Sequence, residues 1–266
     1  MTRAKPFKAH SSVATLSKFI YAVDQIHKSW NKDPNHQFDA WFRGHADASW
    51  SLLPSLYRDH AVRDYGETHM DDFKLKAHPY LAGVASEPAT DWDWYFLMQH
   101  HGLPTRLLDW TEGALLGLYF AVRDSLNTYA DASKPPDACV WVLDPWSLNL
   151  KVAKKGDRIL YPTEKPVRGY LSEATEPPAS PIALLATLKS RRIAAQKGVF
   201  TLHGAHARGL ETYTALRPHL ARIDIPWNAI DRIRRSLVRA GITETTVFPE
   251  LPGLSRELLY YWRDEY

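Results

Sequence analysis

The chain has 266 residues, of which 45% are hydrophobic and 24% are charged, and its formal net charge is +3. This composition is typical of a globular protein and argues against a disordered or fibrous chain. No stretch approaches the roughly 18 apolar residues of a membrane-spanning helix, and the N-terminal sequence lacks the apolar segment of a signal peptide. The single cysteine, Cys139, lies in an apolar run, which predicts an inert buried thiol and excludes an internal disulfide. We therefore expect a soluble, cytoplasmic protein made of one large domain or two small ones.

The first third of the chain predicts two helices and one aromatic strand. After a polar, basic arm, apolar residues recur at helical spacing over 16–26 and predict an amphipathic helix. The run 38–45 is typical of a short strand that carries Arg43 and turns at Gly44. A further helix is expected around 68–79.

Residues 94–122 place a polar segment between two apolar helices. One helix is expected over about 91–100 and a buried one from 112 to about 124, with a Gly-Leu-Pro turn and an extended piece over 105–110 between them. Thr111 stands where its hydroxyl suits an N-cap. Polar groups between buried elements must bond to each other or to a ligand, because an unpaired buried group costs about 1–3 kcal/mol. This stretch is therefore the first candidate for a functional site.

The second half predicts buried strands separated by one long, loop-rich insertion over 151–181. The expected elements are strands at 138–143, 196–204 and 220–225, a helix over 230–238 closed by Gly241, a turn over 247–254 and a short aromatic helix at the end of the chain. Strands and helices mix without a strict βαβ alternation, so we predict an α+β fold.

Three short signatures resemble one known family. They are Trp41-Phe42-Arg43-Gly44, the run 99–111 (QHHGLPTRLLDWT), and 196–200 (QKGVF) taken with 248–254 (FPELPGL). Together they resemble the FRG domain family, named for a Phe-Arg-Gly motif, most clearly over 38–143. We expect a domain over 37–254, preceded by an arm and helix at 1–36 and followed by a tail at 255–266.

A more distant resemblance is to ADP-ribosyltransferases, in which an aromatic-Arg-Gly strand holds NAD and a later strand and helix shape the nicotinamide pocket. Residues 42–44 resemble the first element and 108–121 the second. The resemblance implies a mixed-sheet core with surrounding helices, and NAD as the substrate without a metal. It also implies transfer of ADP-ribose to a macromolecular acceptor. The third element of that family is a strand glutamate that polarises the ribose, and here it has two candidate replacements, Gln196 and Glu250.

The resemblance also implies roles for particular residues. The residues implied to bind NAD are Phe42, Arg43, Gly44, His100, His101 and Arg106, and those implied to act in catalysis are Arg43, Asp109, Thr111, Gln196 and Glu250. Gly44 would let a phosphate approach closely because it has no side chain. Adjacent histidines point in different directions, so only one of the pair is expected at the site. The scattered histidines and lone cysteine offer no ligand set at metal spacing.

Several of these residues could instead have a purely structural role. Arg43 can instead pair with Asp109, Arg106 can pair with Asp109 to fix the loop, and Thr111 can be an N-cap alone. The basic cluster of Lys189, Arg191 and Arg192 is either a solvated face or a patch for a nucleic acid such as RNA, a possible acceptor.

At the level of function, we expect an ADP-ribosyltransferase-like enzyme. The alternatives are a non-catalytic nucleotide or nucleic-acid binding module and a nuclease. The resemblance further suggests a bacterial toxin or phage-defence role, with an antitoxin or chaperone as partner.

Overall fold

The computed structural model of the chain describes residues 7–30, 40–58, 68–81, 88–129, 133–171, 177–185 and 191–264. Within these ranges a seven-stranded sheet has the order β1-β7-β4-β2-β3-β6-β5. Only β1 and β7 pair in parallel, so the sheet is mixed and the α+β prediction is confirmed. The strands are β1 (Ser11–Ser12), β2 (Trp41–His45), β3 (Leu107–Thr111), β4 (Ala138–Leu143), β5 (Ile182–Leu184), β6 (Gly198–Leu202) and β7 (Leu220–Ile225).

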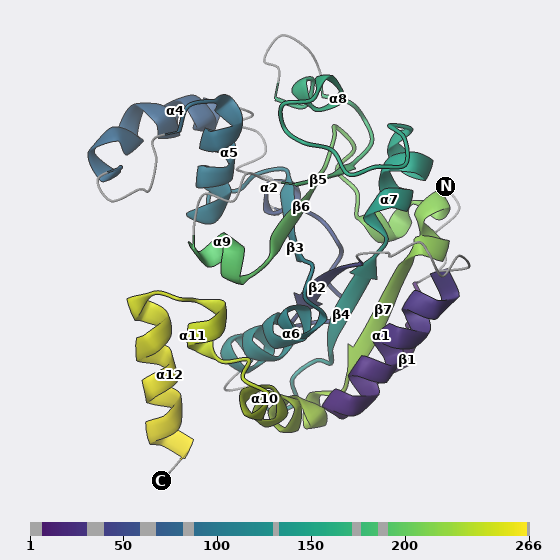
Figure 1. Cartoon of the computed structure of the whole chain (residues 1–266), viewed down its shortest axis with the longest axis vertical. Helices are drawn as coiled ribbons and strands as arrows, with labels where there is room; N and C mark the ends of the chain where they lie inside the picture. The colour runs from purple at the N-terminus through teal and green to yellow at the C-terminus, as the bar shows by residue number, and fades with distance from the viewer. Residues whose placement is uncertain are drawn as a thin grey trace.

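Helices surround this sheet (Figure 1). The α-helices are α1 (Leu16–Trp30), α2 (Ser55–Arg58), α4 (Thr68–Ala77), α5 (Asp91–His100), α6 (Ala114–Thr128), α7 (Pro145–Ser147), α8 (Lys165–Arg168), α9 (Arg191–Ala195), α10 (Ile230–Arg239), α11 (Glu244–Val247) and α12 (Leu251–Asp264). Shorter 3-10 turns and one π-helical segment, η2 (Leu148–Ala153), join them. Across the described ranges, no helix combines the length and apolar character needed to cross a membrane.

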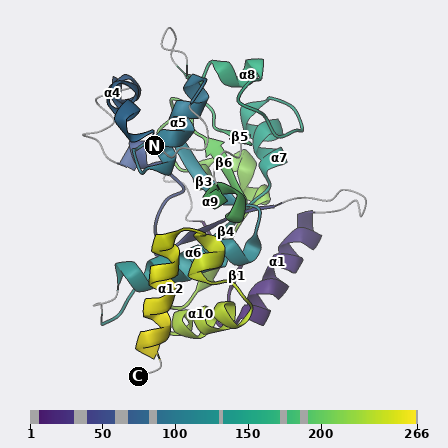
Figure 2. The same cartoon turned by 60° about the vertical axis from the view of Figure 1, so that its left-hand side comes forward.

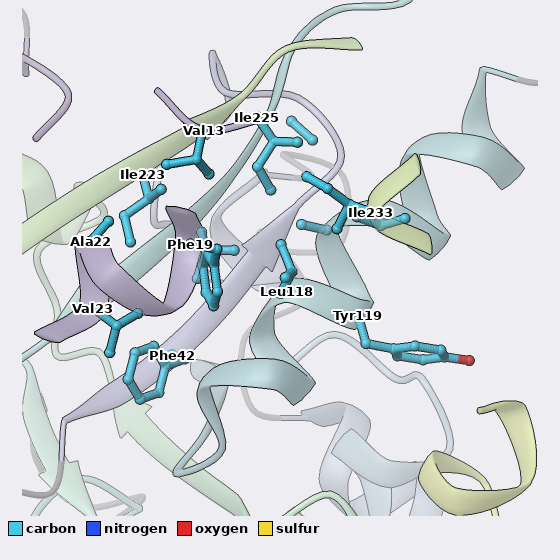
Figure 3. Packing of buried hydrophobic residues seen from close by; sticks show 14 of the residues in the cluster. Val13, Phe19, Ala22, Val23, Phe42, Leu118, Tyr119, Ile223, Ile225 and Ile233 are labelled. Carbon is cyan, nitrogen blue, oxygen red and sulfur yellow. The ribbon is translucent and has the colours of Figure 1, made fainter. Parts of the chain in front are cut away.

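One face of the sheet is covered by two separate groups of helices. Over β2, β4 and β7 lie α1, α6 and α10, which share one buried cluster with those strands. Figure 3 shows Phe42 of β2 near Phe19 and Val23 of α1, with Leu118 of α6 in the same cluster. Over β3, β5 and β6 lies α5, whose Phe96 belongs to a different buried cluster. The helices over this face therefore form two groups, and the two groups meet above β2 and β3.

Two glycines let α6 lie directly on β2. A Cβ atom at Gly44 would come within 2.2 Å of the backbone nitrogen of Ala121 and 2.3 Å of the carbonyl oxygen of Gly117. A Cβ atom at Gly117 would come within 2.7 Å of the Cβ of Phe42. The missing side chain of Gly44 thus makes room for α6, which corrects the prediction that it makes room for a phosphate.

Three elements have the limits that the sequence predicts. The elements predicted over 91–100, 138–143 and 220–225 are α5, β4 and β7 with the same limits. Cys139 is buried, as predicted, and its burial raises the pKa of the thiol.

Several boundaries differ from the prediction, and Gly44 lies within β2 rather than at a turn. Helix α6 begins at Ala114, two residues later than expected, and its N-cap is Gly113 rather than Thr111. The insertion over 151–181 contains α8, and Val167 of that helix is buried. The turn expected to run to 254 ends earlier, because α12 begins at Leu251.

A half-buried glutamate, Glu244, joins α11 to α6 and α12. The carboxylate of Glu244 accepts hydrogen bonds from the hydroxyl of Tyr119 at 2.5 Å, from Nε of Arg123 at 2.8 Å and from Nε of Arg256 at 2.7 Å. Burial acts to raise the pKa of Glu244, but these hydrogen bonds and the charge of Arg123 outweigh it and lower the pKa. A charged Glu244 therefore stabilises the fold.

This arrangement predicts a pH-dependent stability. A lowered folded-state pKa contributes stability above the ordinary glutamate pKa, and that stability is lost as the pH falls through the folded-state value. We expect Glu244→Gln to lower the free energy of unfolding at neutral pH by about 1–3 kcal/mol and to reduce its loss between about pH 5 and pH 3. Urea unfolding across that range measures both effects. The control is Glu250→Gln, an exposed position, and equal acid sensitivity of Glu244→Gln and the wild type would contradict the prediction.

Candidate functional site

A cavity of about 360 Å³ lies over the junction of β2 and β3, between the two groups of helices. Figure 2 shows α9 between the part of the molecule that holds α5 and the part that holds α11 and α12. The lining residues come from six elements, β2, α5, β3, α6, α9 and β6, and the short segments beside them: Phe42, Arg43 and Gly44; Phe96, Gln99, His100 and Gly102; Asp109, Trp110 and Thr111; Phe120 and Asp124; Arg192, Ile193 and Gln196; and Gly198 and Phe200. Most of the residues predicted for the site therefore meet in one place.

The cavity lies where two neighbouring strands separate. Strands β2 and β3 pair at a single position, Phe42 opposite Thr111, whereas β3 and β6 pair at five positions. Because side chains alternate along a strand, Arg43 starts on the face opposite Phe42. The gap between the strands lets its guanidinium reach β3, where Nη1 donates to the carbonyl oxygen of Asp109 at 2.6 Å.

Asp109 is the most strongly oriented carboxylate in the cavity. Its Oδ2 accepts from Nε2 of Gln99 at 2.8 Å and lies 3.8 Å from Nη1 of Arg43. Gln99 is itself held, because its Oε1 accepts from the hydroxyl of Thr105 at 2.5 Å. The Asp109 side chain is 56% exposed, so a fixed carboxylate faces a site that a ligand can enter. The predicted alternative of an Arg43–Asp109 ion pair is thus present, within the cavity.

Behind the cavity, a neutral histidine supports Arg43. Nε of Arg43 donates to Nε2 of His45 at 3.1 Å. Burial and then the charge of Arg43 lower the pKa of His45 to about 3, so its ring is neutral at physiological pH and Nε2 can accept. Burial also lowers the pKa of Arg43, and Asp109 opposes that change. An arginine remains charged through the neutral range, so Arg43 presents a positive charge next to Asp109.

Aromatic rings form much of the remaining wall. Phe96 and Phe200 lie with ring centroids 5.3 Å apart, and Phe120 lines the side formed by α6. Opposite them, the guanidinium of Arg192 lies 4.9 Å from the centre of the Phe248 ring. The cavity thus combines flat apolar surfaces with two arginines.

Two predicted catalytic residues line the cavity but are bonded to the protein. The hydroxyl of Thr111 donates to the carbonyl oxygen of Gln196 at 2.7 Å and accepts from the backbone N–H of Gly113 at 3.0 Å. Nε2 of Gln196 donates to the carbonyl oxygen of Val247 at 3.3 Å. Both side chains therefore tie the walls of the cavity together.

Other predicted residues lie elsewhere. His100 lines the cavity, whereas His101 is exposed beyond α5 and does not, in line with the expectation that only one of the pair is at the site. Glu250 is exposed and is not a lining residue. Arg106 is buried and donates through Nη2 to the carbonyl oxygen of Tyr170, which removes it both from the cavity and from the predicted pair with Asp109.

The predicted basic cluster is represented in the cavity by Arg192 alone. Lys189 and the side chain of Arg191 lie outside the part of the chain that the structure describes. Over the described part, no group of three or more His, Cys, Asp or Glu side chains is arranged as metal ligands.

Sequence reasoning missed several residues of the cavity, among them two polar ones, Gln99 and Asp124. Gln99 lay in the polar run of 99–111, yet nothing in the pattern showed that it would orient Asp109. Asp124 lies one helical turn after Phe120 on α6, and that spacing is the signal that would have placed both on one face.

Comparison with known proteins gives a match for only some of the elements that line the cavity. No curated protein and no solved structure matches the chain. Four elements that line the cavity, β2, α5, β3 and α6, lie within one stretch of about a third of the sequence. That stretch, residues 39–129, matches the family model described as FRG domain.

Proposed function

We propose that this chain transfers ADP-ribose from NAD to a macromolecular acceptor. The observation that carries the proposal is the meeting of Arg43 with the oriented carboxylate of Asp109 at the point where β2 and β3 separate. A guanidinium beside a fixed carboxylate, within an aromatic-walled cavity, supplies the groups that NAD needs.

Each part of NAD has a complementary surface in the cavity. Arginine guanidinium groups bind phosphate oxygens through charge-assisted hydrogen bonds, and Arg43 and Arg192 are available for the diphosphate. Phe96 and Phe200 offer faces for a planar ring. A volume of about 360 Å³ falls within the range of small-ligand sites. NAD would therefore enter with its diphosphate near the arginines and one ring against the aromatic wall that Phe96 and Phe200 form.

Asp109 would stabilise the positive charge that develops during the reaction. When the bond between C1′ of the ribose and nicotinamide breaks, positive charge develops on the ribose ring. A carboxylate already held in place stabilises that charge without reorganising. Asp109 takes this role in preference to the predicted Gln196 and Glu250, because Gln196 is bonded to Val247 and Glu250 is outside the cavity.

The test uses NAD labelled on its adenylate half, incubated with the protein and with RNA, DNA or cell extract. We expect label transfer and nicotinamide release by the wild type, and loss of both in Arg43→Ala. Removing a charged hydrogen-bond partner costs about 1.5–3 kcal/mol, which corresponds to binding of NAD weakened by about 10- to 100-fold. Equal activity in Arg43→Ala, or no transfer and no release by the wild type, would contradict the proposal.

One observation favours a second candidate, a non-catalytic nucleotide-binding module. Neither predicted replacement for the strand glutamate offers a free side chain to the cavity. In that case NAD or another nucleotide would bind without release of nicotinamide. A nuclease would instead cleave RNA or DNA without NAD. A nucleic-acid acceptor, a role as a toxin or in phage defence, and a neutralising partner remain predictions, and the same labelling experiment identifies the acceptor.

A further inference from the structure

A second carboxylate, Asp124, lines the same cavity from a different element. It lies on α6, one turn after Phe120, and lines the cavity together with Asp109 on β3. Nη1 of Arg123 holds Oδ1 of Asp124 at 3.0 Å. Arg123 is anchored independently by Glu244, at 2.8 Å, so it does not depend on Asp124 for its position.

The two carboxylates have different surroundings. Asp109 receives a hydrogen bond from Gln99 and has Arg43 close by, both on Oδ2. Asp124 has Oδ1 paired with Arg123, and no described residue donates a hydrogen bond to its Oδ2. Burial raises the pKa of Asp124, although Arg123 and Arg43 act to lower it. Two carboxylates whose environments differ in this way are suited to different tasks in one reaction.

We propose that Asp124 is a catalytic residue that accepts the proton of the acceptor nucleophile as ADP-ribose is transferred. This inference rests on the proposed function and adds the second half of the reaction to it. An acceptor oxygen or nitrogen forms a bond to C1′ of the ribose. The bond from C1′ to nicotinamide breaks, and its electron pair leaves with nicotinamide. The proton of the acceptor moves to Oδ2 of Asp124 and from there to water.

The assignment restricts the class of acceptor. A carboxylate acceptor has no proton to lose at neutral pH and needs no base. A hydroxyl group or an N–H group must lose a proton as it attacks, and a positioned base contributes on the order of 100-fold or more to such a step. We therefore infer an acceptor that attacks through O–H or N–H.

Chemical rescue by azide tests the role of Asp124 directly. Azide is an anionic nucleophile that has no proton to give up, so it does not need the base. We expect Asp124→Asn to lower transfer to the macromolecular acceptor on the order of 100-fold while NAD still binds. Added azide should restore nicotinamide release in Asp124→Asn and yield an azide adduct of ADP-ribose. Azide should not restore release in Asp109→Asn, whose defect would lie in charge stabilisation.

The pH dependence supplies a second readout that a purely structural role would not change. The charged groups that act on Asp124 are Arg123 on its own helix, Arg43 on β2 and Glu244 on α11. Asp109 on β3, His100 on α5 and Arg192 on α9 line the same cavity. Asp124 can act only when it is deprotonated, so transfer should rise with pH through its raised pKa. That rise should be absent when Asp124→Asn is rescued with azide.

The outcomes separate this inference from the proposed function. Wild-type transfer rates in Asp124→Asn, or failure of azide to restore release while NAD still binds, would overturn the role of Asp124 and leave the proposed function standing. Absence of nicotinamide release and of transfer by the wild type would overturn both. The matched control is Asp72→Asn, an exposed aspartate of α4 that pairs with Lys76 at 3.8 Å and should retain full activity.

Discussion

Asp109→Asn is expected to lower kcat for release of nicotinamide from NAD on the order of 100- to 1000-fold, with little change in KM. The substitution keeps the shape of the side chain and removes its negative charge. Charge that develops in the transition state is then left without its fixed partner, and losses of this size follow removal of one preorganised electrostatic group. NAD binding should persist, because Arg43 is also held by the carbonyl oxygen of Asp109 and by His45.

Two further variants separate orientation from charge. Gln99→Ala leaves the carboxylate in place but removes the amide that orients it at 2.8 Å, so it should reduce kcat by a smaller factor. Asp72→Asn removes a negative charge from the surface of α4 and should leave kcat unchanged. If Asp109→Asn matched the wild type in a steady-state assay of nicotinamide release, Asp109 would have no electrostatic role.

Gly44→Ala is expected to lower the free energy of unfolding by about 3 kcal/mol, the upper end of the usual cost of overpacking. The added Cβ would meet the backbone nitrogen of Ala121 at 2.2 Å and the carbonyl oxygen of Gly117 at 2.3 Å. Both atoms belong to the backbone of α6, so neither can move aside as a side chain does. Relief would require α6 to move away from β2, which would open the core and disturb the wall that carries Phe120 and Asp124.

The comparison variant for Gly44→Ala is Gly169→Ala. There the nearest atom to an added Cβ is Cγ of Pro178 at 3.9 Å, an ordinary contact, so stability should change by less than about 0.5 kcal/mol. Chemical denaturation of the purified variants measures both values. Equal stability of Gly44→Ala and Gly169→Ala would show that close contact between β2 and α6 is not needed for the fold.

The elements that local sequence patterns predicted accurately are those whose own residues show that they are buried. The run from Ala138 to Leu143 is apolar at every position, and β4 is buried on both faces of the sheet. Helix α5 has the predicted limits of 91–100, and its start is fixed by adjacent residues, because the hydroxyl of Thr90 accepts from the backbone N–H of Asp93.

Relations between distant segments could not be predicted in the same way. The contact of Gly44 with α6 joins residues more than 70 positions apart, and nothing in a Phe-Arg-Gly motif states which backbone will fill the space. Arg43 lies within β2, and Arg106 directly precedes β3. Tertiary packing buries Arg106 against Tyr170 and leaves Arg43 at the gap between β2 and β3. Which of the two arginines lines the cavity therefore depends on where β2 and β3 separate.

A calorimetric titration of NAD into the wild type and Arg43→Ala tests most directly whether the cavity over β2 and β3 holds NAD. We predict one NAD per chain for the wild type and binding weakened by about 10- to 100-fold in Arg43→Ala, since a charged contact to phosphate is lost. Absence of NAD binding by the wild type, or equal affinity in the two proteins, would contradict this account of the site.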